Sequence, residues 1–258
     1  MADPIVLENM AVWLGGYDIT GSLNENHFTL ARAENDDSRF GDTIEAKFPG
    51  RLIPTLDHKG FYESGVPGAG SPDEAIGNAR VLAGSRTSWP ITICPPYAPA
   101  ATPAADGNVC YSILGAQSMY DIGGKHGDSL PYSLKTLPRS QGSGGAVARQ
   151  VIMLPKATYA ATTTGTVQTL GLLGATQVLV GVLHVFAVTG GSWVLTIESD
   201  DNAPFASPVV RQTFTAATAI ARQAVILQGP VATDTFWRAV LTKTGGTSCV
   251  AAVALGIV

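Results

Sequence analysis

The residues with the best potential for chemistry are scattered along this chain of 258 residues. Ser143 stands between two glycines, but it lacks the complete GxSxG pattern and lies in a polar Gly/Ser run, where a flexible loop is the favoured interpretation. The histidines show neither an HExxH motif nor another metal-ligand spacing. They are His27, His58, His126 and His184. The sequence therefore predicts no catalytic residue, and we expect a protein that is not an enzyme.

A cation is the small ligand that the sequence fits best. Glu198, Asp200 and Asp201 cluster where a strand is expected to end, and Ca²⁺ prefers such oxygen ligands. We favour a simpler interpretation, in which the aspartates accept hydrogen bonds from the turn that follows them. Cation binding by these acids stays open at this stage. No glycine-rich phosphate loop occurs, so we expect no cofactor.

The composition excludes several classes of protein. Hydrophobic residues make up 45% and charged residues 14%, with 29 Gly and 16 Pro, which argues against a charged disordered chain or a coiled coil. The net charge of −4 supplies no cationic field for tight nucleic-acid binding. Three cysteines (Cys94, Cys110 and Cys249) are odd in number and widely spaced, so the sequence predicts no disulfide framework and favours a reducing compartment.

A membrane span is the alternative for one apolar stretch. Residues 157–197 contain no Asp, Glu, Lys or Arg, and Leu170–Val188 has the length of a spanning helix. This stretch is interrupted by several glycines and by His184, so we expect buried β-strands and no membrane span. The N-terminus has no basic region followed by an apolar core, so we expect no secretory signal.

Charge and composition divide the chain near residue 150. Residues 1–150 hold 16 acids and 11 bases, a balance of −5, whereas residues 151–258 hold four acids and five bases, a balance of +1. Pro138–Gly145 has the composition of a linker between the two parts. We therefore expect a first domain over residues 1–150 and a second, β-sandwich domain over residues 151–258.

Most of the chain has the alternating pattern of strands, and one helix is expected. Ser71-Pro72-Asp73-Glu74 forms a capping box, which predicts a helix that ends near Gly84. Two hairpins are expected in the second domain: Val180–Val188 with Trp193–Glu198, and Phe236–Leu241 with Cys249–Leu255. The further strand candidates are 6–7, 11–14, 28–31, 44–48, 51–55, 89–93, 209–214 and 224–227. The predicted fold class is mainly β, or α+β.

Several short motifs resemble those of tail tube (major tail) proteins of long, non-contractile-tailed bacteriophages. The motifs in residues 12–24 (Val-Trp-Leu-Gly-Gly-Tyr-Asp-Ile-Thr-Gly-Ser-Leu-Asn), 39–43 (Arg-Phe-Gly-Asp-Thr), 48–51 (Phe-Pro-Gly-Arg) and 59–61 (Lys-Gly-Phe) occur in that order. Residues 190–201, 236–238 and 253–257 are similar to the back half of a subset of these proteins. The resemblance implies a tube-forming β-sandwich or barrel with one flanking helix, and no catalytic activity.

The resemblance also implies partners and a location. Copies of the chain would form stacked homo-hexameric rings in the virion tail, assembled in the host cytoplasm, through which DNA passes without specific binding. Tape-measure and tail terminator proteins would be partners. Because no internal repeat is seen between residues 1–150 and 151–258, six chains per ring are favoured over the alternative of three.

Residue roles follow from the resemblance as well. Tyr17 and Asp18, like Phe40, Gly41 and Asp42, would shape turns, and the acidic loop Glu34–Asp42 would bridge successive rings; its acids are Glu34, Asp36, Asp37 and Asp42. Three alternatives remain. They are a glycan-binding or surface-decorating sandwich that uses Trp193 or Trp237, a hydrolase that uses Ser143, and another virion protein such as a head decoration or tail terminator.

Overall fold

The computed structural model describes residues 10–36, 47–62, 89–96, 102, 104–125, 129–138 and 147–258. Its elements are β1 (Ala11–Leu14), β2 (Tyr17–Asp18), a 3-10 turn η1 (Thr20–Ser22), β3 (Leu23–Asp36), β4 (Lys47–Phe61), β5 (Trp89–Cys94), β6 (Val109–Ile122), β7 (Pro131–Pro138), β8 (Val147–Tyr159), β9 (Thr163–Thr164), β10 (Gln168–Thr169), β11 (Val178–Thr189), β12 (Ser192–Asp200), β13 (Val209–Thr213), β14 (Ala221–Gln228), β15 (Phe236–Thr244) and β16 (Ser248–Ile257). The prediction of a mainly β fold is confirmed.

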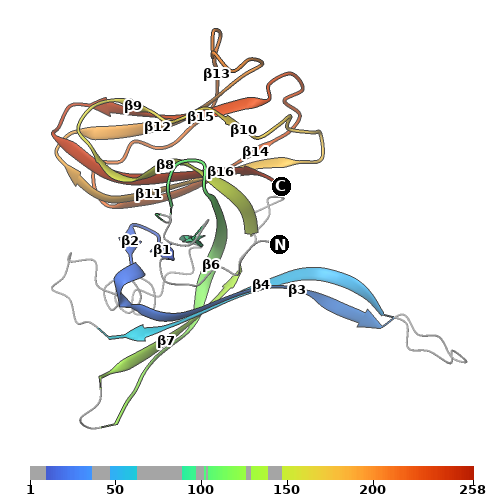
Figure 1. The fold of residues 1–258 in the computed structure, drawn as a ribbon, viewed down its shortest axis with the longest axis vertical. Coiled ribbons are helices and arrows are strands. Elements are labelled where there is room, and N and C mark those ends of the chain that lie inside the picture. Colours follow the sequence, from blue (N-terminus) through green and yellow to red (C-terminus); the bar gives the residue numbers. More distant parts are fainter. Residues whose placement is uncertain are drawn as a thin grey trace, which may run out of the picture.

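A large antiparallel sheet runs through most of the molecule (Figure 1). Its strand order is β14-β11-β16-β8-β6-β5-β1-β2, and β6 also pairs with β7, which leads on to β4 and β3. The long strand β6 therefore belongs to two parts of the sheet. Its first half pairs with β5 and β8, and its second half pairs with β7.

A second, small sheet covers one end of the large sheet. It has the order β10-β15-β12-β13, with β9 beside β15, and lies above β8, β16 and β11 in Figure 1. The two sheets enclose the main hydrophobic core. This core includes Leu183, Trp193, Leu195, Trp237 and Val253, all almost fully buried. Inward-facing residues alternate along β12 and β15, as expected for strands with one face on a core. The predicted sandwich in the back half of the chain is thus present.

Both predicted hairpins are wrong in their connectivity. The strands themselves form where expected, but β11 lies in the large sheet and β12 in the small sheet, and the same holds for β16 and β15. Each connection is an arch that crosses the sandwich, and the two arches are nested: Thr247 N donates to Thr189 O at 2.7 Å. A glycine pair at a positive φ suits either a hairpin turn or such an arch, so the local pattern does not separate them.

The arches contact each other through two glycine pairs, Gly190-Gly191 and Gly245-Gly246. All four residues have φ between +66° and +77°. A Cβ on Gly191 would lie 2.3 Å from the Gly245 carbonyl carbon, and one on Gly246 would lie 2.0 Å from the Gly190 oxygen. The close approach of the two backbones therefore requires glycine at both positions.

The large sheet curls until β5 and β2 contact β14 and β11. A chain of buried polar side chains crosses this interior. His184 Nδ1 donates to Gly15 O, and its Nε2 lies 2.7 Å from Thr92 Oγ1. Thr92 Oγ1 lies 2.8 Å from Ser112 Oγ, which donates to Gln150 Oε1. This series of hydrogen bonds ends where Gln150 Nε2 donates to Val180 O at 2.8 Å.

The polar chain begins and ends on β11 and links it to β5, β6 and β8. Burial lowers the pKa of His184 to about 4, so this histidine is neutral at pH 7. His184 is therefore a buried, hydrogen-bonded residue of the interior.

The remaining predicted elements can be compared with the structure where its residues are described. The helix over Ser71–Gly84 and the strand at residues 6–7 lie outside the described residues. The strands at 11–14, 28–31, 51–55, 89–93 and 224–227 fall within β1, β3, β4, β5 and β14. The boundary expected near residue 150 falls inside β8, which pairs with both β6 and β16, so the large sheet is continuous there. Independent folding of the two parts stays a prediction.

Candidate assembly surface

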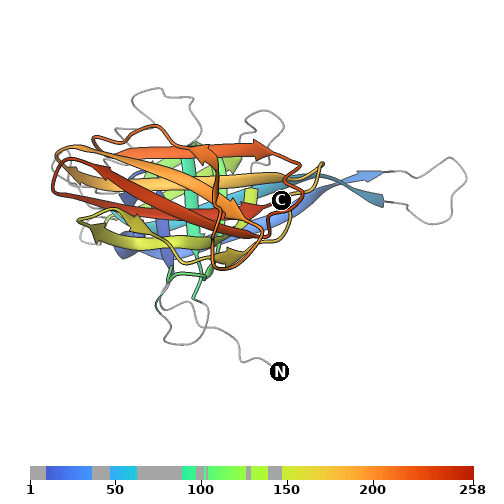
Figure 2. The same cartoon turned by 90° about the horizontal axis from the view of Figure 1, so that it is seen from above.

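Four strands extend from the body as a distinct part of the large sheet, which we call the outer sheet. It consists of β3, β4, β7 and residues 115–122 of β6. The β3–β4 pair continues beyond its neighbours as an arm that projects from the side of the molecule (Figures 1 and 2). Near the start of the arm, Leu30 is about half exposed.

One face of the outer sheet closes a hydrophobic core. Leu56, Tyr132 and Leu134 are buried there with residues of β1 and β5, including Leu14 and Trp89. His58 lies in the same layer, fully buried, and burial lowers the pKa of His58 to about 3. His58 is therefore a neutral core residue at pH 7.

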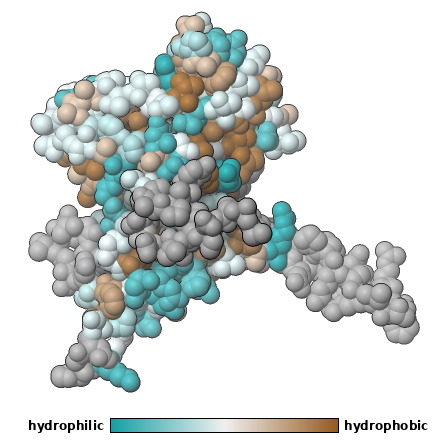
Figure 3. Space-filling model, in the orientation of Figure 1, coloured by the Kyte–Doolittle hydropathy of each residue, from teal (hydrophilic) through white to brown (hydrophobic). Residues whose placement is uncertain are grey.

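The other face is polar and carries both signs of charge in two cross-strand rows. Glu25, Lys59, Ser133 and Asp121 lie in register in one row. His27, Asp57, Lys135 and Met119 form the second row. Residues directly opposite on antiparallel strands share a face and interact. Figure 3 shows hydrophilic residues gathered on the lower part of the molecule, where Figure 1 places the outer sheet.

Ion pairs fix part of this polar face. Lys59 Nζ lies 2.9 Å from Glu25 Oε2, and His27 Nε2 lies 2.9 Å from Glu25 Oε1. The hydrogen bond from Lys59 is the main cause that lowers the pKa of the exposed Glu25 carboxyl. Because these groups are exposed, the pairs contribute little stability and are screened by salt.

Both edges of the outer sheet are unpaired within the described part of the chain. Among the described strands, β3 forms ladder pairs with β4 alone, and residues 116–122 of β6 form them with β7 alone. An open strand edge carries unsatisfied backbone donors and acceptors and is a template for pairing with another chain. Large apolar side chains are exposed at the same edges, namely Leu30 on β3 and Met119 and Ile122 on β6. This combination defines the candidate assembly surface.

The structure places some of the predicted assembly residues inside the body. Tyr17 and Asp18 form β2, and the Tyr17 ring stacks on Trp89 with centroids 6.4 Å apart. Asp18 accepts the backbone N–H of Thr20 at 3.0 Å and pairs with Lys156 at 2.5 Å. Its carboxylate thus fixes the start of η1 and ties it to β8. Its role in contacts between copies stays a prediction.

The predicted acidic loop, Glu34–Asp42, is partly strand. Glu34 and Asp36 lie in β3, opposite Pro49 and Lys47 of β4, near the far end of the arm. Asp37, Phe40, Gly41 and Asp42 lie outside the described residues, as do Ser143 and His126. None of β6, β7 and β8 was among the predicted strands.

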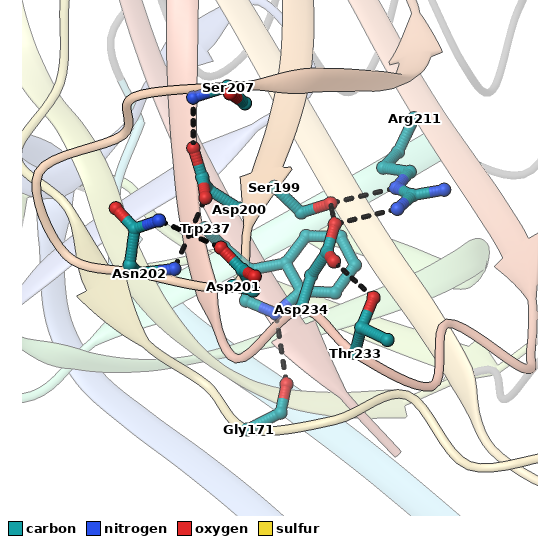
Figure 4. A network of polar contacts seen from close by, with 10 residues as sticks. All are labelled: Gly171, Ser199, Asp200, Asp201, Asn202, Ser207, Arg211, Thr233, Asp234 and Trp237. Atoms are coloured by element: carbon teal, nitrogen blue, oxygen red, sulfur yellow. Dashed lines mark hydrogen bonds and ion pairs between the residues drawn. The ribbon is translucent and has the colours of Figure 1, made fainter.

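The acids near residue 200 serve as structural acceptors (Figure 4). Asp200 is buried and accepts the backbone N–H groups of Asn202 at 3.1 Å and Ser207 at 2.8 Å. Glu198 pairs with Arg238 at 2.7 Å. The interpretation of Asp200 as a turn cap is confirmed. In the described residues, no group of three or more His, Cys, Asp or Glu side chains is placed to hold a metal ion.

A neighbouring network centres on Asp234 (Figure 4). This carboxylate accepts from Ser199 Oγ, Thr233 Oγ1 and Arg211 Nη2, each at 2.6 Å. Burial alone would raise the pKa of Asp234, but these hydrogen bonds and the Arg211 charge lower it to about 2. The network joins β12, β13 and the segment before β15.

The basis of the glycan-binding alternative is absent. Trp193 and Trp237 are 1% and 0% exposed, and Trp237 Nε1 donates to Gly171 O at 3.0 Å in the sandwich core. Neither ring is available for stacking on a sugar at the surface. Among the described residues, no helix has the length and apolar character needed to cross a membrane. The expected buried strand is present as β11.

No protein-family model and no curated protein matches this sequence. Several solved structures are similar at low identity. The SPP1 Dit (gp 19.1) protein, described as a hub adsorption apparatus in phages that infect Gram-positive bacteria, is 13% identical, with 97% of this chain and 100% of that chain covered and a TM-score of 0.36. A chain from the virion of a native gene transfer agent particle is 12% identical over 55% and 95% of the two chains, with a TM-score of 0.39.

A chain from the tube-terminating cap of the anti-feeding prophage is 13% identical over 58% of this chain and 93% of that chain, with a TM-score of 0.38. Similarities at this level do not assign the present chain to a family.

Proposed function

We propose that this chain is a structural protein of a phage tail, whose copies associate through the outer sheet into rings that stack as a tail tube. The observation that carries the proposal is the pair of open edges on β3 and on residues 116–122 of β6. When one edge of a subunit pairs with the other edge of its neighbour, the contact is head-to-tail. Such contacts produce a closed ring when the rotation from each subunit to the next adds up to a full turn.

The strand directions fit this contact. β3, β4, β7 and β6 alternate in direction because each neighbouring pair is antiparallel. If β3 of one copy lies beside the outer half of β6 of the next, the new pair is also antiparallel, and the ladder continues around the ring. Closure of the ring would leave no open edge, and the exposed Leu30 and Ile122 would be covered.

The polar face would line the lumen, because the opposite face is occupied by the core. Its described charged residues include Glu25, Asp57 and Asp121 against Lys59 and Lys135. A face without a basic excess does not gather DNA phosphates, since phosphate binding requires clustered Lys and Arg. DNA could therefore slide past this face. We propose six copies per ring, with tape-measure and tail terminator proteins as partners and the virion tail as the location.

Electron microscopy of negatively stained protein across a concentration series tests the proposal. We expect hollow rings or tubes, and their loss when Ile122→Lys places a charge at the β6 edge. Val210→Lys is the matched control, because Val210 is an exposed residue on the edge strand β13 of the small sheet, away from the outer sheet. Both variants should retain the wild-type unfolding midpoint. Particles that stay small at every concentration, or rings that survive Ile122→Lys, would contradict the proposal.

A further inference from the structure

Two of the three cysteines are neighbours across a strand pair. β5 and β6 are antiparallel with Ile93 opposite Tyr111, so the next residues in register are Cys94 and Cys110. Both side chains belong to the same buried cluster. Their separation of 16 positions in the sequence does not reveal this contact, because the contact depends on the register of β5 against β6.

The backbone geometry of this position suits a disulfide. Opposed residues in an antiparallel pair have Cα atoms about 4.5 or 5.5 Å apart, depending on the type of pair. Disulfides are found at Cα separations of about 4.4–6.8 Å. Either type of cross-strand pair therefore allows a bond between Cys94 and Cys110 without a shift of the strands.

The surroundings separate this pair from the third cysteine. Cys94 and Cys110 are both fully buried in a cluster with small neighbours that include Ala11, Ala104 and Ala252. Cys249 is also buried, but it belongs to the core between the two sheets. A bond between Cys249 and either member of the pair would require the strands to rearrange.

We propose that Cys94 and Cys110 are a redox site that closes to an intramolecular disulfide when a low-molecular-weight disulfide such as glutathione disulfide is available. One thiolate attacks the oxidant and releases one glutathione thiolate. The second thiolate then attacks the mixed disulfide and releases the other. In total, two cysteine thiols are oxidised to one disulfide, and glutathione disulfide is reduced to two molecules of glutathione. This inference does not depend on the proposed function.

The reaction is expected to be slow in the folded protein. Burial is the main cause that raises the pKa of the Cys110 thiol well above its ordinary value, and the neighbouring Cys94 raises it further. Because the thiolate is the reactive species, closure requires that this end of β5 opens or that the bond forms during folding. Reduced chains would thus persist in a reducing compartment, and the bond would accumulate after transfer to an oxidising one.

The test uses the full chain with Cys249→Ser, so that the pair holds the only thiols. The protein is incubated folded, and in parallel refolded from denaturant, with glutathione disulfide. We expect slow loss of two hydrogens from the intact mass in the first sample and rapid loss in the second, with a peptide that links Cys94 to Cys110. The control variant Cys94→Ser/Cys249→Ser should form no intramolecular bond under either condition.

The oxidised chain should also be more stable. The bond closes a loop of about 15 residues, which corresponds to an increase in melting temperature on the order of 10 °C over the reduced chain. Two results would overturn the proposal. One is a pair that keeps free thiols after refolding in the oxidant, and the other is an oxidised chain that melts at or below the temperature of the reduced chain.

Discussion

The sandwich and the outer sheet are held together in different ways. In the sandwich, nested arches connect the two sheets, and a buried network around Asp234 ties the segment before β15 to β12 and β13. In the outer sheet, two edges stay open within the described residues, and the ion pairs lie exposed on one face. The sandwich is thus tied together by contacts within the chain, whereas the outer sheet keeps the two open edges to which our proposal assigns the contact with a second copy.

The largest effect is expected at the nested arches. Gly246→Ala places a Cβ 2.0 Å from the Gly190 oxygen, in addition to the cost of a positive φ. Gly245→Ala has the same φ cost, but its nearest neighbour is 3.9 Å away. We expect a loss in the free energy of unfolding of about 1 kcal/mol for Gly245→Ala and at least about 3 kcal/mol for Gly246→Ala, measured by urea denaturation. Equal losses would show that the arches can separate at little cost.

The polar chain inside the curled sheet is expected to come next. Thr92→Val removes a buried hydroxyl that bonds His184 and Ser112, so both partners lose a hydrogen bond. Leaving buried polar groups unpaired costs about 1–3 kcal/mol. Thr92→Ser keeps the hydroxyl and should lose clearly less. Thermal unfolding of the two variants measures the difference, and similar melting temperatures would mean that the hydroxyl contributes nothing.

A pH-dependent effect is expected in the sandwich. The pKa of Asp234 is about 2 in the folded protein, below the ordinary value of 3.8. Its contribution is therefore complete above about pH 4 and disappears as the pH falls through 4 to 2. Asp234→Asn should lower stability at pH 7 by about 2 kcal/mol and flatten the pH profile in this range. An unchanged slope between pH 4 and 2 would show that Asp234 is not linked to folding.

The smallest effect is expected on the outer sheet. Lys59→Met removes the ion pair with Glu25, but both side chains are at least 40% exposed. An exposed pair of this kind is screened by solvent and contributes little to the free energy of unfolding. Denaturation at low and high salt should give nearly the same midpoint for Lys59→Met, whereas the wild type should lose its small advantage at high salt. A loss near that of Thr92→Val would remove the contrast between the two regions.

Strands were easier to predict from the sequence than their partners. Trp193, Leu195 and Ile197 alternate with exposed or half-buried residues, and β12 formed as that pattern indicates. The pairing of β12 could not be predicted, because Gly190-Gly191 fits a hairpin and an arch equally. The outer half of β6 was missed for another reason. Its side chains are exposed or only partly buried in a single subunit, so the sequence carries no clear core-facing pattern there.

Functional residues could likewise be predicted only where their contacts are local in the sequence. The acids Asp200 and Asp18 were identified as polar residues at turns, and both accept backbone N–H groups close in the sequence. The rows of charge on the outer sheet and the contact between Cys94 and Cys110 depend on the register of distant strands. Such pairings join residues that are far apart in the chain, and no local pattern encodes them.

The position of β16 has a consequence for synthesis of the chain. This strand, Ser248–Ile257, lies in the middle of the large sheet between β11 and β8, although it is the last strand of the sequence. A ribosome must therefore deliver residue 257 before the two halves of the sheet can join. A chain that terminates before Ser248 lacks a central strand rather than a peripheral one, so it cannot join β11 to β8 and form the large sheet as a continuous structure.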